Sequence, residues 1–213
     1  MIVDERMRAF INSFATPDSP ELAELERYSL ETNVPIIRKE MQTFIKFLLA
    51  VKEPKNILEV GTAIGFSACL MAENTPTETT ITTIEKFEKR IPEARENFRK
   101  LGFSNRITLI TGDATLILTQ LMEPYDFIFM DAAKGQYINF LPDVMRLLKP
   151  GGILLSDNVM QEGDILESKF AVERRNRTIY KRMRDYLYEL THSDELTTTI
   201  LPLGDGVTVS VKR

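Results

Sequence analysis

Residues 56–65 read Asn-Ile-Leu-Glu-Val-Gly-Thr-Ala-Ile-Gly. The apolar run at 56–60 predicts a strand, and the segment from Ser67 to Glu73 predicts a helix directly after the turn. Gly61 and Gly65 allow the backbone of such a turn to approach a ligand closely, and a helix N-terminus offers free N–H groups to an anion. A tight strand-to-helix connection without a ligand is the alternative interpretation of the glycines alone.

The chain beyond residue 54 alternates short β-rich runs with helical stretches, which is typical of βαβ units and a parallel sheet. We expect strands at 56–60, 80–85, 106–111, 125–131 and 152–157, and helices at 67–73, 87–101, 114–122 and 137–148. Two further β-branched runs, 196–201 and 207–211, are joined by a Gly-containing connection and predict an antiparallel hairpin. The predicted fold is α/β and doubly wound, with a Rossmann-like, seven-stranded, mostly parallel sheet and a C-terminal antiparallel hairpin.

The first 53 residues are helical in pattern, with proline and asparagine interruptions at 16–20 and 33–35. Apolar residues at a spacing of three and four form one stripe for packing, made of Ile37, Met41, Phe44, Ile45, Leu48 and Leu49. We expect these residues to form an N-terminal helical cap on a catalytic α/β core at 54–213. A length of 213 residues suits one large α/β domain or two small ones, and a single domain spanning 1–213 is the simplest interpretation.

The composition is that of an ordinary globular protein, with 43% hydrophobic and 27% charged residues. No stretch approaches the roughly 20 consecutive apolar residues that cross a bilayer, which argues against a membrane-spanning protein. Residues 1–8 are charged and lack the apolar run of a secretory signal. The single cysteine, Cys69, excludes an internal disulfide and a four-thiolate zinc site. We therefore expect a cytoplasmic protein without a membrane partner.

The net charge of −4 conceals one strongly basic segment. Between Lys169 and Arg184 there are seven basic residues and a single acid, Glu173, so this segment carries +6 and the rest of the chain −10. Such an asymmetry indicates an anionic partner that binds at one place. A solvated, charged helix face is the alternative.

Polar side chains follow the predicted strands where each strand ends. Glu85 closes the second strand, where a carboxylate can accept the hydroxyl hydrogens of a ribose, and Asp113 follows the third, where it can meet an adenine amino group. Asp131 follows the fourth strand, and Asp157 with Asn158 follows the fifth. Because the carboxyl ends of parallel strands share one edge, these oxygens form a donor set suited to Mg²⁺, Mn²⁺ or Ca²⁺. A helix cap and a turn are the alternatives for the two aspartates.

The pattern Glu59-x-Gly61-x-x-x-Gly65, followed by the acid Glu85, resembles the class I methyltransferases that use S-adenosylmethionine (SAM). It departs from the Gly-x-Gly-x-x-Gly fingerprint of dinucleotide enzymes. The resemblance implies that SAM is the cofactor and that these residues bind it. The further cofactor-binding residues that we predict are Met41, Ser67, Asp113, Ala114 and Asp131. Core packing is the alternative for Met41, and a first-turn cap is the alternative for Ser67.

Asp131-x-x-Lys134 together with Asp157-Asn158 resembles the cation-dependent O-methyltransferases of the catechol and caffeoyl-coenzyme-A type, over roughly Val34 to Arg213. The resemblance implies that Asp131, Asp157 and Asn158 bind Mg²⁺ or another divalent cation such as Mn²⁺, which two neighbouring oxygens of the substrate then chelate. Lys134 would be the catalytic residue that takes the proton from the hydroxyl to be methylated.

Within this family the chain resembles a bacterial branch that methylates 5-hydroxyuridine at the tRNA wobble position and forms 5-methoxyuridine. The segments that carry the resemblance are 33–36, 57–65, 131–137, 174–177 and 202–206. The implied partner is the tRNA anticodon loop, bound by Arg174, Arg175, Arg177, Lys181 and Arg182. Tyr137, Phe140 and Tyr180 are candidate stacking groups, with packing as the alternative.

Two other functions remain open at this point. One is O-methylation of small catechol-like or caffeoyl phenols, although this chain has Ala132 and Ala133 where the animal catechol enzyme has His and Trp. The other is a non-catalytic RNA-binding protein, which would need neither Lys134 nor the donor set of Asp131, Asp157 and Asn158. Relatives often pair, so we also expect a homodimer, with the helices of residues 1–33 as the candidate interface.

Overall fold

The computed structural model describes residues 4–213; residues 1–3, which belong to the predicted dimer interface, lie outside the described part. Its helices are α1 (Glu5–Asn12), α2 (Pro20–Glu31), α3 (Lys39–Lys52), α4 (Phe66–Glu73), α5 (Ile91–Lys100), α6 (Ala114–Gln120), α7 (Tyr137–Leu147) and α8 (Arg177–His192), with short 3-10 helices η1 (Lys134–Gln136) and η2 (Gln161–Leu166). Its strands are β1 (Asn56–Val60), β2 (Thr80–Glu85), β3 (Ile107–Thr111), β4 (Tyr125–Met130), β5 (Leu148–Ser156), β6 (Leu196–Leu201) and β7 (Val207–Lys212).

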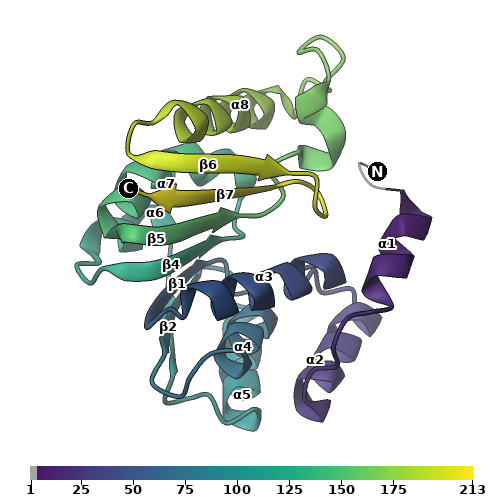
Figure 1. Ribbon diagram of the computed structural model, residues 1–213, viewed down its shortest axis with the longest axis vertical. Coiled ribbons are helices and arrows are strands. Elements are labelled where there is room, and N and C mark those ends of the chain that lie inside the picture. Colours follow the sequence, from purple (N-terminus) through teal and green to yellow (C-terminus); the bar gives the residue numbers. More distant parts are fainter. Residues whose placement is uncertain (1–3) are drawn as a thin grey trace.

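The strands form one seven-stranded sheet in the order β3-β2-β1-β4-β5-β7-β6 (Figure 1). The first five strands pair in parallel, and β7 lies antiparallel between β5 and β6. The predicted mostly parallel sheet with a C-terminal antiparallel hairpin is therefore confirmed. The chain order reverses between β1 and β4, which are neighbours in the sheet. Such a switch point opens a crevice at the carboxyl ends of the strands, where ligands bind in α/β sheets.

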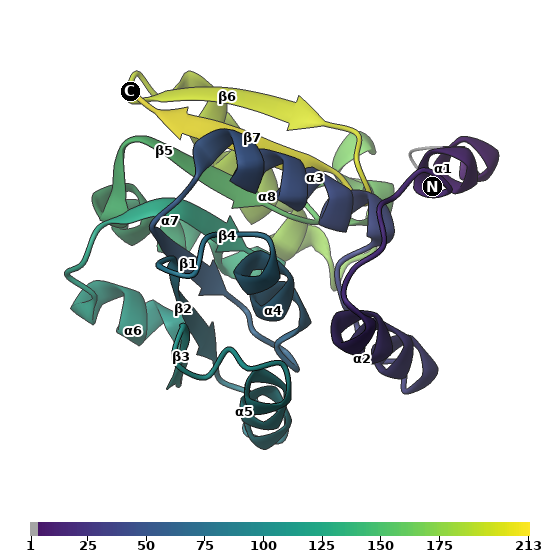
Figure 2. The ribbon, with the colours of Figure 1, turned by 60° about the horizontal axis from the view of Figure 1, so that its bottom comes forward.

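Alternate residues of the central strands face two separate apolar cores. Ile57 of β1 packs with α2, α3, α4 and α5, whereas its neighbour Leu58 packs with α6, α7 and α8. The two groups of helices lie on opposite sides of the sheet (Figure 2). Strands that are covered on both faces read as nearly continuous apolar runs, which explains the sequence pattern of β4 and β5.

Most element ends lie within a few residues of the predicted ones, and two differences have a local cause. Helix α5 begins at Ile91 instead of residue 87, because Pro92 occupies its first turn and the preceding residues form a turn in which the Arg90 N–H donates to the Phe87 carbonyl at 2.9 Å. Strand β5 begins at Leu148 instead of residue 152, because Leu148 pairs with Tyr125 beyond an irregularity in the register.

The N-terminal helices differ in how firmly they are attached. Helix α2 is capped by Ser19, whose N–H also donates to Glu73 of α4 at 3.0 Å, and Lys39 of α3 pairs with Asp18 at 3.1 Å. Helix α1 has no buried residue and lies apart from the sheet (Figure 2). None of the helices within residues 4–213 is long and apolar enough to cross a membrane.

Candidate active site

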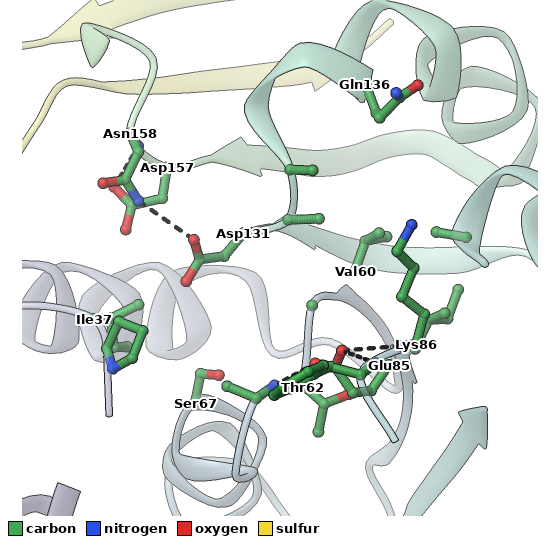
Figure 3. A pocket seen from close by; sticks show the side chains of 18 of the residues that line it. Ile37, Val60, Thr62, Ser67, Glu85, Lys86, Asp131, Gln136, Asp157 and Asn158 are labelled. Carbon is green, nitrogen blue, oxygen red and sulfur yellow. Dashed lines mark hydrogen bonds between the residues drawn. The ribbon is translucent and has the colours of Figure 1, made fainter. Parts of the chain in front are cut away.

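A cavity of about 580 Å³ opens at the carboxyl ends of the parallel strands (Figure 3). Its size lies within the usual range of roughly 300–1,000 Å³ for small-molecule sites. The sequence-predicted residues that line it are Met41, Gly61, Ser67, Glu85, Asp113, Ala114, Asp131, Asp157 and Asn158. The fold thus brings most of the predicted cofactor and metal residues together around one space.

The turn after β1 passes directly against the end of β4. Gly61 has a φ of +106°, and a Cβ atom on it would lie 2.1 Å from the carbonyl oxygen of Asp131. Any side chain there would collide with backbone, so the close approach requires glycine. The Ala63 N–H of the same turn donates to Glu85 at 2.8 Å. Gly61 and Glu85 therefore hold the first turn in place between the second and fourth strands.

Glu59 and Gly65 do not line the cavity. The Glu59 side chain is 0% exposed and accepts hydrogen bonds from the hydroxyls of Ser67 and Thr83. Burial raises the pKa of Glu59 to about 7. At Gly65, which begins α4 with a φ of +87°, a Cβ atom would lie 2.4 Å from the Phe98 ring of α5. Both residues act beneath the cavity, where Glu59 orients Ser67 and Gly65 allows α4 and α5 to pack closely.

Glu85 and Asp113 hold another part of the cavity wall through bonds to nearby backbone and side-chain groups. Besides Ala63, the Glu85 carboxylate accepts from the N–H groups of Lys86 and Phe87 at 2.9 and 2.8 Å. Asp113 caps α6 through Thr115 at 2.9 Å and pairs with Lys86 at 3.2 Å. A carboxylate offers about four acceptor positions, so each retains capacity for a ligand hydroxyl or amino group.

Met41 and Ser67 both line the cavity. Met41 is also a core residue, and Ser67 also lies in the first turn of a helix, which are the alternatives given for them above. Met41 is buried within the apolar stripe of α3 and forms part of the cavity wall. Ser67 lies in the first turn of α4, but its hydroxyl donates to Glu59 and it borders the cavity. Packing and ligand contact therefore do not exclude one another at these positions.

Asp131, Asp157 and Asn158 lie side by side at the ends of β4 and β5 (Figure 3). The Asn158 side-chain amide donates to Asp131 Oδ1 at 3.3 Å, and the Asn158 backbone N–H donates to Asp157 Oδ1 at 2.7 Å. Asn158 adopts a left-handed conformation with a φ of +61°, which asparagine tolerates better than most residues. This turn brings three oxygen-bearing side chains to one point of the cavity wall.

The electrostatics of this cluster favour a bound cation. Burial raises the pKa of Asp131, and burial together with the nearby charge of Asp131 raises the pKa of Asp157. Two neighbouring carboxylates repel one another when both are ionised. A divalent cation between them would stabilise both as anions. Rotation of the Asn158 side-chain amide by half a turn would put its oxygen where its nitrogen now faces Asp131. The residues present therefore fit a hard cation with oxygen ligands.

Lys134 lies on η1, beside the cavity and not among the residues that line it. Its ammonium nitrogen is 3.3 Å from Asp205 Oδ2, and Asp205 does line the cavity. The Asp205 side chain is only 7% exposed, and its other oxygen accepts from the Glu162 N–H at 2.7 Å. Asp205 belongs to the segment 202–206 that carries the sequence resemblance, but no role was predicted for it. Its position between Gly204 and Gly206 was the only signal.

The predicted tRNA-binding residues divide into two groups. Arg177, Lys181 and Arg182 line a shallow groove between α7 and α8, which we call the basic groove. Its other lining residues are Lys169, the acid Asp185, Ile138, Asn139 and Thr178, so four basic side chains face one acidic one. Arg174 and Arg175 lie outside the groove, in the loop that precedes α8.

The basic groove adjoins the cavity. Asn139 of the groove donates to the side-chain oxygen of Gln136 at 2.7 Å, and Gln136 lines the cavity. Arg182 donates to the Gly135 carbonyl at 3.1 Å, one residue from Lys134. The walls of the two depressions are therefore in direct contact through η1.

Two of the three candidate stacking groups are packing residues instead. Tyr137 and Tyr180 are buried, and their hydroxyls donate to backbone carbonyls of Met130 and Glu167, each at 3.1 Å. Neither ring can meet a base that arrives from solvent. Phe140 is also buried and forms part of the cavity wall.

A sequence model of the O-methyltransferase family matches residues 12–213, which is nearly the whole chain. The chain belongs to the O-methyltransferase family. Among curated relatives, a catechol O-methyltransferase of Niastella koreensis is 30% identical over 168 residues, covering 77% of this chain and 70% of the relative. Caffeoyl-CoA O-methyltransferase 5 of Nicotiana tabacum is 30% identical over 176 residues, covering 78% and 72%.

Solved structures of O-methyltransferase relatives share the whole fold. A methyltransferase of Podospora anserina, crystallised with SAH bound, superposes with a TM-score of 0.88 at 27% identity and covers 98% of this chain and 94% of its own. These similarities confirm the predicted resemblance to the catechol and caffeoyl-CoA type and the predicted enzyme class, a SAM-dependent O-methyltransferase.

Proposed function

We propose that this O-methyltransferase requires a divalent cation and methylates a hydroxyl that has a second oxygen on the adjacent atom. The observation that carries the proposal is the meeting of Asp131, Asp157 and Asn158 at one point of the cavity, with the Lys134–Asp205 pair beside it. A cation held there would supply Lewis acidity, which lowers the pKa of a neighbouring hydroxyl.

The reaction assigns a part to each group of residues. Gly61, Glu85 and Asp113 would hold SAM, which would supply the methyl group. Lys134 would take the proton from the acceptor hydroxyl. When bound, SAM would supply the methyl group to the hydroxyl oxygen as its carbon–sulfur bond breaks, and the neutral thioether SAH would remain. Proximity of the two reactants supplies much of the acceleration.

We propose tRNA as the acceptor, with the 5-hydroxyl of 5-hydroxyuridine at the wobble position as the methylated group. That hydroxyl and the neighbouring 4-carbonyl oxygen are adjacent, as in a catechol. The basic groove supports this acceptor, because its cationic side chains adjoin the cavity through Gln136 and Asn139. Lys and Arg that neutralise phosphates account for most of the affinity of nucleic-acid complexes. We also propose a cytoplasmic location, where such a tRNA would be available to the enzyme.

A small catechol-like or caffeoyl phenol is the second candidate acceptor. The names of the relatives favour it, since the curated proteins cited above are catechol and caffeoyl-CoA O-methyltransferases. The same donor set and the same lysine would serve both acceptors. The chain's own charge distribution favours tRNA over a small catechol, because a catechol without anionic groups gives no use to the +6 segment at 169–184.

The two acceptors are separated by one experiment. Purified protein is incubated with methyl-labelled SAM and Mg²⁺, and with either 5-hydroxyuridine-containing tRNA or caffeic acid. We expect label in the tRNA, with 5-methoxyuridine found on nucleoside analysis and none formed in the presence of a chelator. Label in the phenol alone would overturn the tRNA acceptor, and transfer that persists in the chelator would overturn the cation requirement.

We also propose that the protein forms a homodimer through its N-terminal helices. Met7, Phe10, Ile11 and Phe14 form an exposed apolar face on α1 and the residues after it. A contiguous apolar patch of this kind is typical of a protein interface. Light scattering after size exclusion should give a dimer for the wild-type protein and a monomer for the Phe10→Asp/Phe14→Asp variant. A monomeric wild-type protein would contradict the proposal.

A further inference from the structure

The loop of residues 167–176, between η2 and α8, carries the most exposed large apolar side chain in residues 4–213. Phe170 is 88% exposed, and the loop projects beyond the N-terminal end of α8 (Figure 1). A single apolar side chain on a surface needs no explanation by itself. Phe170 differs because of the charge around it, since Lys169 precedes it and the segment 169–184 carries +6.

The backbone of this loop is built to a definite shape. The Arg177 guanidinium donates to the carbonyls of Val172 at 3.1 Å and Phe170 at 3.4 Å. The Ala171 N–H closes a turn onto the Ser168 carbonyl at 2.9 Å. Val172 is buried in the core beneath α8. The loop is therefore anchored on both sides of Phe170 while the ring itself remains in solvent.

Phe170 lies next to the basic groove. Its neighbour Lys169 lines the groove, and Arg177, which fixes the Phe170 carbonyl, lines it as well. The groove in turn adjoins the cavity through Asn139 and Gln136. A strand that enters the cavity along this path would meet cationic side chains first and an exposed aromatic face beside them. Proteins that hold unpaired nucleotides combine these two features, a cationic track for phosphates and an aromatic ring for a base.

We propose that Phe170 stacks on an unpaired base of the RNA acceptor, beside the nucleotide that enters the cavity. The proposal rests on the proposed tRNA acceptor and adds the element that selects a single-stranded loop over a duplex. Phosphates in the basic groove supply affinity for any RNA, whereas only a base that has left the helical stack offers its face to Phe170.

The absence of tryptophan from the sequence provides a direct test. In the Phe170→Trp variant the new indole is the only one in the protein, and stacking on a base quenches its fluorescence. We expect quenching by an anticodon stem-loop RNA and none by a fully paired duplex of equal charge. Binding of the same RNA is measured separately by fluorescence anisotropy, without SAM, so that the result does not depend on catalysis.

Substitution at the same position should separate stacking from charge. Phe170→Ala should weaken stem-loop binding by about 5- to 150-fold, since stacking on one base is worth about 1–3 kcal/mol. The loss should be the same at low and high salt. Phe170→Tyr should restore binding. Leu166→Ala is the matched control, because Leu166 precedes the same loop, is 67% exposed and has no ring.

Each other outcome overturns the proposal in a distinguishable way. Wild-type binding of the stem-loop with no quenching and no loss in Phe170→Ala would refute the role of Phe170 and leave the tRNA acceptor standing. Absence of wild-type binding would refute both. A fluorescence change that depends on protein concentration alone would identify a second copy of the chain as the partner, and a change with anionic lipid vesicles but not with RNA would identify a membrane surface.

Discussion

The ammonium group of Lys134 lies 3.3 Å from the carboxylate of Asp205, although the two residues are 71 positions apart in the chain. Asp205 belongs to the connection between β6 and β7, and Lys134 belongs to η1 after β4. The C-terminal hairpin thus fixes the position of the proposed catalytic base. Because the Asp205 carboxylate is nearly buried, its negative charge acts on Lys134 with little screening by water.

The Asp205→Asn variant tests this positioning role. Asparagine keeps the shape and an acceptor oxygen but removes the charge, and a hydrogen bond to a charged group contributes about 1.5–3 kcal/mol. We expect kcat to fall by about 10- to 100-fold while the KM for SAM changes little. Asp164→Asn is the control, since the Asp164 side chain accepts a hydrogen bond from Asn176 outside the cavity. Equal kcat values for Asp205→Asn and the wild-type protein would refute the role.

Lys134→Ala should abolish most turnover and leave cofactor binding intact. A general base contributes about 10²- to 10⁴-fold to the rate, and Lys134 does not line the cavity in which SAM is expected to bind. Steady-state assays and calorimetry with SAM measure the two effects separately. Lys149→Ala, which breaks a pair with Asp126 elsewhere, is the control. Turnover at the wild-type rate would eliminate Lys134 as the base.

Glu59 makes the stability of the fold depend on pH. Burial raises its pKa from 4.5 to about 7, so between these values the folded state binds a proton that the unfolded state has lost. Stability therefore falls as pH rises through this window, by about 3 kcal/mol in total at about 1.4 kcal/mol per unit. Urea unfolding should show a steeper fall between about pH 4.5 and 7 for the wild-type protein than for Glu59→Gln, in which only the raised pKa values of Asp131 and Asp157 still contribute. Parallel curves for the two proteins would contradict it.

Reversing the charge of Lys169 and Lys181 to glutamate should weaken tRNA binding and flatten its salt dependence. Both residues line the basic groove. Each lost phosphate contact reduces the slope of log K against log salt concentration by about 0.7 for a single strand. Arg95→Glu/Lys100→Glu on the exposed side of α5 changes the net charge equally and is the control. If both double variants alter the slope alike, the groove has no special part in binding.

The sequence predicted the sheet and the convergence of Asp131 with Asp157, because residues that directly follow parallel strands must share one edge. It also predicted that Glu85 and Asp113 reach the same cavity for the same reason. The features that the sequence predicted less well are those that depend on contacts between distant segments. Glu59 follows the family pattern but faces Ser67 and Thr83 beneath the cavity floor.

Other features were out of reach of pattern reasoning for similar physical causes. The need for Gly65 comes from the Phe98 ring, which only the packing of α5 on α4 brings near. The pairing of Asp205 with Lys134 requires the hairpin connection to settle on η2, where the Met160 side chain occupies the space that a Cβ on Gly206 would fill. A tyrosine is compatible with both a surface and a core position, so the sequence alone could not show that Tyr137 and Tyr180 are buried.

Binding of Mn²⁺ is the most direct test of the donor set of Asp131, Asp157 and Asn158. Electron paramagnetic resonance titration of the wild-type protein should show about one Mn²⁺ bound per chain. Asp157→Asn should weaken that binding by at least about 10-fold, the smallest loss expected even for a residue that only supports a metal ligand. Asp126→Asn, which lies at the opposite end of β4, should bind as the wild type does. A wild-type protein that binds no Mn²⁺, or an Asp157→Asn variant that binds it equally well, would contradict the account.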